Sequence, residues 1–118
     1  MNVFAHQLYE CKKGVRSMAL ATLQPKDLHL AERKIISAKM AYHIHMVSDS
    51  KVNVFFGKEE CINVIKRMCN KPLYMLSIEE DFILGAMLGY SICEQCNRYC
   101  SRKQRQGNMP NVVGVDKA

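Results

Sequence analysis

The 118-residue sequence has no apolar run long enough to span a membrane, and its start, "MNVFAHQLYECKK", has no basic segment followed by an apolar one. We therefore expect a cytoplasmic protein, whose six cysteines stay reduced. The sequence also lacks G-x-S-x-G and H-E-x-x-H, the motifs of many serine hydrolases and zinc peptidases. From the sequence we assign no catalytic residue, no metal ligand and no cofactor.

Positive charge is in excess. Seventeen Lys and Arg face eleven Asp and Glu, which gives a formal net charge of +6. Such a balance favours an anionic partner, which can be nucleic acid, an acidic protein or an anionic lipid surface. The sign of the charge alone does not choose among them.

Hydrophobic periodicity predicts a short helix, a strand, a second helix, a β-hairpin and a third helix. In the hairpin, alternate residues of "AYHIHMV" and "KVNVFF" are apolar, which is typical of two strands that share one buried face. The third helix has a single apolar face, typical of a packing helix. The predicted ranges are 2–11, 15–23, 24–39, 41–47 with 51–56, and 58–69.

This order of elements predicts an α+β fold with a three-stranded antiparallel sheet. It is the order of a ferredoxin-like unit without its fourth strand, and a right-handed crossover then places residues 51–56 in the middle, in the strand order 1-3-2. The strand at 15–23 is left with one unpaired edge. We expect the first helix or a second copy of the chain to cover it.

The chain is expected to end in one long C-terminal helix. Ser77 and Glu80 form an S-x-x-E capping box, and we predict a helix of about 25 residues, or about 38 Å, that continues to Arg102. We expect a single α+β domain over residues 1–103. The basic and polar tail, residues 104–118, lacks periodicity and is expected to be mobile.

Five small residues would share one face of that long helix. At roughly 100° per residue they fall within an arc of about 80°. We expect this face to be a packing or dimer seam, with free cysteine acting as a small hydrophobe. Its members are Gly85, Gly89, Cys93, Cys96 and Cys100.

The C-x-x-C-x-x-x-C pattern in this face is a poor metal site. Cys93 and Cys100 lie about 10 Å apart along a helix axis, whereas two sulfurs on one zinc are at most about 4.6 Å apart. An adjacent pair could ligate a metal only with a distant Cys11, Cys61, Cys69 or a histidine.

Other polar residues have simpler interpretations. His43 and His45 share one face of a strand, a spacing that can bind metal, but we expect this to be the solvent-facing side of the hairpin. Lys58 follows Gly57 at a helix start, where backbone N–H groups can hold an anion, but an ordinary helix entry is expected.

Three segments resemble a known family, namely "HQLYECKKGVR" (6–16), "NVFFG" (53–57) and "KPLYMLSIEEDFILGAMLGYSICEQCNRY" (71–99). They resemble a small uncharacterised bacterial family, with members in Bacteroidetes, that is catalogued as a domain of unknown function. The resemblance implies three strands, five helices and a homodimer, with no established activity. It also implies proximity to flavodoxins, because members are often encoded beside them.

Three functions from different classes follow from these observations. The first is a non-enzymatic interaction or accessory protein that meets an acidic partner such as flavodoxin. The second is a non-specific nucleic-acid-binding protein, favoured by "SRKQRQ", with Phe55 as the one obvious stacking residue on the sheet. The third is a thiol- or metal-dependent enzyme, which the helical spacing of the cysteines disfavours.

Overall fold

The computed structural model describes residues 1–107, and its internal contacts divide the chain into two compact units, Met1–Leu76 and Ser77–Ala118. Each unit is described by itself. The single domain over residues 1–103 stays a prediction, and most of the predicted tail, residues 108–118, lies outside the described part. Among residues 1–107, no helix has the length and apolar character needed to cross a bilayer.

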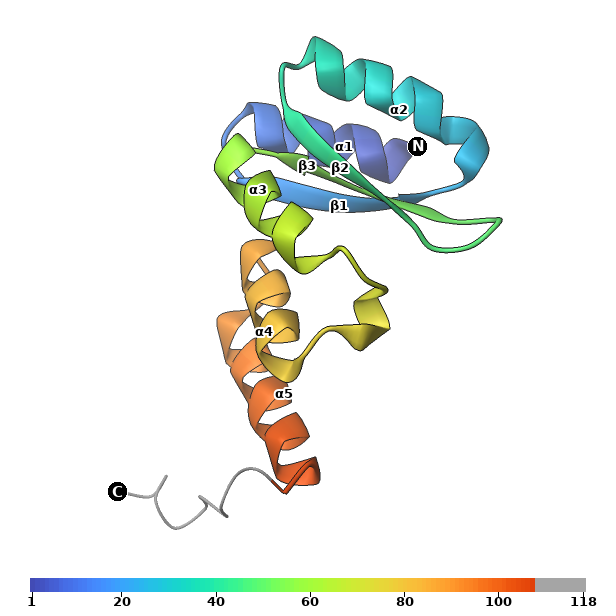
Figure 1. The fold of residues 1–118 in the computed structure, drawn as a ribbon. Coiled ribbons are helices and arrows are strands. Elements are labelled where there is room, and N and C mark those ends of the chain that lie inside the picture. The colour runs from blue at the N-terminus through green and yellow to red at the C-terminus, as the bar shows by residue number, and fades with distance from the viewer. Residues whose placement is uncertain (108–118) are drawn as a thin grey trace. The chain divides into compact units, whose positions relative to one another are not determined.

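The first unit contains the predicted order of elements, which is therefore confirmed (Figure 1). A short 3-10 helix, η1, was not predicted. The elements are α1 (Asn2–Lys12), β1 (Met18–Leu23), α2 (Pro25–Ser37), β2 (Ala41–Met46), β3 (Val52–Gly57), α3 (Glu59–Met68) and η1 (Leu73–Met75).

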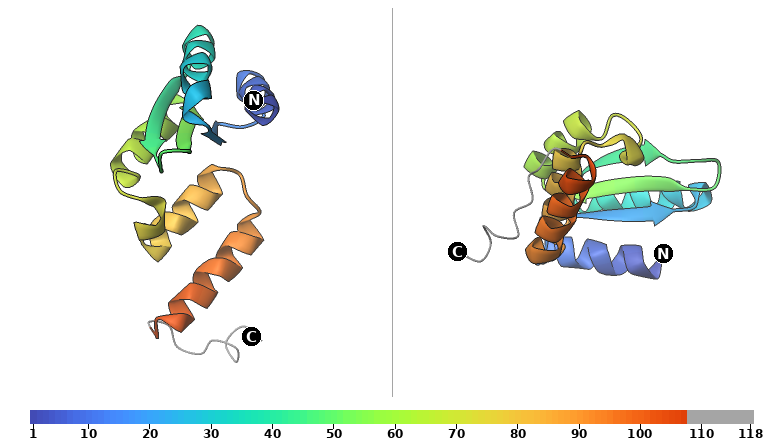
Figure 2. Two further views of the ribbon diagram at one scale, coloured as in Figure 1. Left: turned by 90° about the vertical axis from the view of Figure 1, so that its right-hand side faces the viewer. Right: turned by 90° about the horizontal axis from the view of Figure 1, so that it is seen from below.

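The three strands form one antiparallel sheet in the order β1-β3-β2, as predicted, with β3 in the middle (Figure 2, right). Ala21 of β1 and Ile44 of β2 both pair with Val54 of β3. This register places the alternating apolar residues of all three strands on the same face. The α+β class and the strand order are confirmed.

Helices α1 and α2 cover that apolar face (Figure 1). Phe4 of α1 packs edge-on against Phe56 of β3, with ring centroids 5.3 Å apart. Ala31 and Ile35 of α2 are fully buried in the same cluster. The face therefore holds the main hydrophobic core of the first unit, because both helices turn their apolar stripe toward the sheet.

The opposite face of the sheet, where we expected solvent, is covered by α3, so that expectation is wrong. Phe55 has no exposed surface, and Asn53 is also buried. The Asn53 side-chain oxygen accepts a hydrogen bond of 2.7 Å from the Thr22 hydroxyl. Both faces of β3 are buried because α3 packs its apolar stripe, which includes Ile62 and Ile65, against the second face of the sheet.

The free edge of β1 is covered in part by α1, which is one of the two predicted covers. The side-chain amide of Gln7 donates a hydrogen bond of 3.0 Å to the Leu20 carbonyl. A helix side chain thus satisfies one backbone group on the edge strand.

The second unit contains two helices, α4 (Ile78–Met87) and α5 (Ile92–Arg105), which lie side by side (Figures 1 and 2). The capping box is confirmed, since Ser77 and Glu80 exchange backbone-to-side-chain hydrogen bonds of 2.8 and 3.0 Å. The single unbroken helix to Arg102 is wrong.

The break has a local cause. Gly89 adopts φ +81°, and Tyr90 N–H donates to the Gly85 carbonyl while Gly89 N–H donates to the Ala86 carbonyl. This is a Schellman ending, which glycine permits because it has no Cβ. Ser91 then caps α5 by accepting a hydrogen bond from Glu94 N–H.

Candidate functional site

The predicted seam does not form one continuous face, because its members lie on two helices and the turn between them. Gly85 is buried in α4 at a place where a Cβ would overlap the Gln95 side chain of α5. A Cβ at Gly89 would meet no atom within 4 Å, so the role of this glycine is to form the turn and not to allow close packing of the helices. Close helix packing therefore applies to Gly85 but not to Gly89.

The three seam cysteines lie within α5, so the geometric objection to a shared metal ion holds. Cys93 is exposed in the first turn of α5, rather than toward the C-terminal end of a long helix. Cys96 is exposed and Cys100 is half-buried. Within residues 1–107, no group of three or more Cys, His, Asp or Glu could hold a metal ion.

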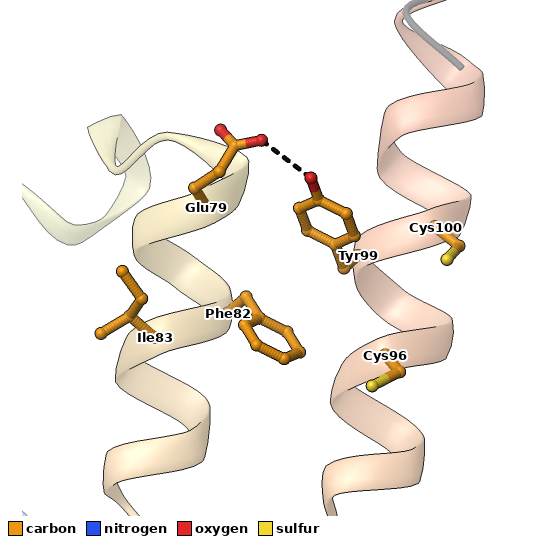
Figure 3. A pocket seen from close by; sticks show the side chains of 6 residues that line it. All are labelled: Glu79, Phe82, Ile83, Cys96, Tyr99 and Cys100. Carbon is orange, nitrogen blue, oxygen red and sulfur yellow. Dashed lines mark hydrogen bonds between the residues drawn. The ribbon is translucent and has the colours of Figure 1, made fainter.

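Cys96 and Cys100 line an apolar groove between α4 and α5, here called the α4–α5 groove (Figure 3). Its cavity volume is about 410 Å³. Phe82 and Tyr99 meet edge-to-face inside it, with centroids 5.7 Å apart. The lining residues are Glu79, Phe82, Ile83, Cys96, Tyr99 and Cys100.

Charged residues beside this groove are bound to one another. Asp81 accepts from Arg98 at 2.8 Å and from Arg102 at 3.1 Å. Glu79 accepts from Lys103 Nζ at 2.6 Å and from the Tyr99 hydroxyl at 3.1 Å. The hydrogen bond from Lys103 holds the pKa of Glu79 below its usual value, and the Glu79 carboxylate raises the pKa of Tyr99 and of Lys103.

A second groove, here called the α1–α2 groove, is cationic. Its cavity volume is about 420 Å³. Within residues 1–107, Lys12, Arg33 and Lys34 form no ion pair, whereas the nearby Glu10 is bound to Arg16 at 3.0 Å. The lining residues are Leu8, Lys12, Leu30, Arg33, Lys34 and Ser37.

The net charge is confined to the first unit. Residues 1–76 carry twelve Lys and Arg against six Asp and Glu, which equals the whole net charge of +6. Residues 77–107 carry four of each sign, and residues 108–118 carry one of each. The first unit would therefore attract an anionic molecule more strongly than the second.

The two strand histidines pack within the first unit. His45 Nε2 is 2.9 Å from the Lys71 carbonyl oxygen, and His43 stacks on Phe55 with centroids 6.4 Å apart. Burial lowers the pKa of His43. These contacts give both rings a structural role.

Gly57 and Lys58 make an ordinary entry into α3. A Cβ at Gly57 would overlap the Ser17 carbonyl oxygen and approach Met18 Cα to 2.6 Å, so β1 passes too close for any other residue. The Lys58 N–H donates a hydrogen bond of 2.9 Å to the same carbonyl. That backbone N–H is therefore already used within the protein.

The sequence did not reveal the α1–α2 groove, because its cations come from helices separated by a strand. A partial signal was present, since Arg33 and Lys34 stand next to each other between the buried Ala31 and Ile35. Such adjacent cations lie beside the buried stripe of the helix, where they can border a groove formed with a neighbouring helix. Which second helix completes a groove depends on the tertiary fold.

A family model described as "Protein of unknown function (DUF2023)" matches residues 2–102. This match confirms the predicted resemblance to a domain of unknown function. No curated protein matches the chain.

Proposed function

The chain belongs to the DUF2023 family of proteins of unknown function, and from this premise we propose that it is a small accessory protein that binds an acidic protein. The partner docks in the α1–α2 groove. The observation that carries the proposal is that the three cations around this groove form no ion pair within the described residues 1–107, in the unit that holds the whole net charge.

The composition of the groove suits a protein partner. Leu8 lies buried in it and Leu30 is 44% exposed, so apolar surface is available between the cations. Protein interfaces combine an apolar centre with a polar rim, and arginine is enriched in them. Unpaired rim cations also speed the encounter with an acidic surface.

Flavodoxin is the candidate partner, because flavodoxins are typically acidic and the family resemblance implies that they are encoded nearby. Such a complex would form in the cytoplasm and would need no cofactor bound to this chain. The protein would then act by positioning or protecting its partner rather than by chemistry of its own.

A nucleic-acid-binding role is the alternative, and two observations weigh against it. Arg102 and Lys103 of "SRKQRQ" are already bound to Asp81 and Glu79. Phe55, expected to stack on bases, is fully buried. Sheet-based binding of single strands relies on exposed aromatic rings.

The test compares two charge-reversed variants in calorimetric titrations with a flavodoxin from the same organism. The first carries Lys12→Glu, Arg33→Glu and Lys34→Glu. The control carries Lys51→Glu, Lys66→Glu and Arg67→Glu, which are exposed in the same unit but do not line the groove. Both variants lose the same net charge.

We expect the groove variant to raise the Kd about a hundredfold, and the control variant to raise it less than about tenfold. Equal losses would overturn the groove as the docking site. No binding by the wild type at low salt would overturn the function. Tighter binding to duplex DNA than to flavodoxin at physiological salt would favour the alternative.

A further inference from the structure

The start of α5 carries two exposed cysteines in a C-x-x-C pair. Because the chain turns at Gly89, Cys93 lies in the first turn of α5 and Cys96 follows one turn later. Both side chains are exposed, so another molecule can reach both sulfurs. Disulfide oxidoreductases use C-x-x-C pairs of this kind. In the single long helix expected from the sequence, the same pair would have been far from any helix start.

We propose that Cys93 and Cys96 form a dithiol site that exchanges with a disulfide in an apolar segment of another protein. This activity goes beyond the proposed binding of an acidic protein. It does not depend on that binding, because neither cysteine lines the α1–α2 groove.

The first turn of α5 can accommodate a disulfide between the two residues. Cβ atoms three residues apart on a helix are about 5–6 Å apart, whereas a disulfide needs about 3.5–4.5 Å, so the backbone has to shift by about 1 Å. The first backbone hydrogen bond of α5 runs from Gln95 N–H to the Ser91 carbonyl, and the Cys93 N–H precedes it. The capping bond from Glu94 N–H to the Ser91 hydroxyl is also long, at 3.3 Å. The turn that holds Cys93 is therefore the part of α5 that can shift.

The third cysteine of α5 is in a different position. Cys100 is half-buried, and it lies one turn after Cys96 in the part of the helix where backbone N–H groups are bonded within the helix. A shift of the backbone there would break those bonds. We therefore expect the disulfide between Cys93 and Cys96. Because that disulfide distorts its helix, it should be easily reduced, as catalytic disulfides are and structural ones are not.

The exchange takes two steps. Cys93 loses its proton and attacks one sulfur of a disulfide R–S–S–R′, which forms a Cys93–S–S–R bond and releases R′–S⁻. Cys96 loses its proton and attacks the Cys93 sulfur, which forms the Cys93–Cys96 disulfide and releases R–S⁻. The two protons end on the two released thiolates. The two cysteines are thus oxidised by two electrons, and the substrate disulfide is reduced to two thiols.

The surroundings of the pair indicate what kind of disulfide it meets. Tyr90 and Ile92, just before Cys93, are 57% and 59% exposed. Cys96 lines the apolar α4–α5 groove, where Ile83 is 42% exposed (Figure 3). Such a surface suits a protein segment with apolar side chains around its disulfide better than a small charged disulfide such as that of glutathione.

The first test locates the disulfide. The full chain is treated with glutathione disulfide, its remaining thiols are alkylated, and it is digested with trypsin. Cleavage after Arg98 separates Cys100 from Cys93 and Cys96, so mass spectrometry distinguishes the possible bonds. We expect a Cys93–Cys96 disulfide in the wild type and in the control Cys100→Ser. A Cys96–Cys100 disulfide, or glutathione attached to the cysteines without an internal bond, would overturn the proposal.

The second test assigns the attacking sulfur. Cys96→Ser should hold glutathione on Cys93 as a stable mixed disulfide, because no second thiol is left to displace it. Cys93→Ser should form a mixed disulfide at Cys96 about tenfold more slowly, because the free N–H groups of the first turn favour a negatively charged sulfur at residue 93. Equal rates in the two variants would overturn the order of the steps.

The third test concerns the substrate. Two short peptides, each with one internal disulfide, carry leucines beside it in one case and serines in the other. The reduced protein should react about tenfold faster with the leucine peptide. Ile83→Glu should remove most of this preference, whereas Val64→Glu, on α3 and 41% exposed, should keep it. Equal rates with both peptides, or a faster reaction with glutathione disulfide, would overturn the assignment of an apolar protein segment.

Discussion

The two units of this chain are built differently. The first has a sheet with both faces of its central strand buried, and it carries the whole net charge. The second has two helices, no net charge, and no buried residue in α5. The hydrophobic core cluster and the net charge thus both lie in the first unit, while the largely uncharged α4–α5 groove lies in the second.

This difference gives the two units different kinds of surface. A charged groove on a sheet-and-helix unit is suited to a partner of opposite charge. A neutral groove between two helices is suited to a partner that is also apolar. The comparison predicts that changes in the first unit alter global stability more than equivalent changes in the second.

The largest effect is expected from Phe56→Ala. The Phe56 ring is fully buried between the sheet and α1, where it contacts Phe4, so its removal leaves a cavity. We expect a loss of about 3–5 kcal/mol in the free energy of unfolding, measured by urea denaturation. Phe82→Ala in α4, where the ring is half-buried, should lose only about 1 kcal/mol. Similar losses would remove the contrast in packing between the units.

A smaller effect is expected from Gly57→Ala. The new Cβ would meet the backbone at Ser17 and Met18, which is fixed by the pairing of β1 with β3. We expect a loss of about 2–3 kcal/mol by the same measurement. Gly14→Ala is the matched control, because Gly14 also has positive φ but nothing lies within 4 Å of its Cβ position. It should lose about 1 kcal/mol, and an equal loss would mean that φ rather than crowding decides the cost.

The sequence predicts the helices and strands of the first unit well. The alternation in residues 41–47 and 51–56 depends on a local period of two, and the register of β2 with β3 preserves it. The helix at 24–39 begins at Pro25 as its pattern indicates. Periodicity could not predict that α3 covers the second face of the sheet. The polar histidines of β2 on that face are typical of a solvent-facing side, and only the tertiary packing of α3 shows otherwise.

The second unit was predicted less well because the prediction of one long helix did not take account of a local signal for a helix end. Gly89 lies on the apolar pattern of a continuous helix, and this pattern suggested packing. The segment "GYSICE" also contains glycine followed by an S-x-x-E pattern at Ser91 and Glu94, which is typical of a helix end and a new start. The grooves in both units depend on which helices become neighbours, and no local pattern encodes that.

Ser77→Ala tests the start of α4. The Ser77 hydroxyl accepts a hydrogen bond from Glu80 N–H, and the Glu80 carboxylate accepts one from Ser77 N–H. Loss of this cap should lower the stability of the second unit by about 1 kcal/mol. Amide hydrogen exchange should show faster exchange in α4 and unchanged exchange in β3. Equal acceleration in both elements would mean that the two units unfold together.

The smallest effect is expected from Glu79, whose side chain is 51% exposed in its ion pair with Lys103, so that solvent screens the interaction. Because Lys103 holds the folded-state pKa of Glu79 below the ordinary value of 4.5, this pair contributes stability above that value and loses it as the pH falls through the folded-state pKa. Carbon-detected NMR titration of the carboxyl group should show Lys103→Met returning the Glu79 pKa toward 4.5. Arg105→Met, which removes a cation from the same last turn of α5, should leave it lowered. A return in both variants would mean that the overall charge of α5, rather than the hydrogen bond from Lys103, sets the pKa, and the charges beside the α4–α5 groove would then be less tightly bound than the distances indicate.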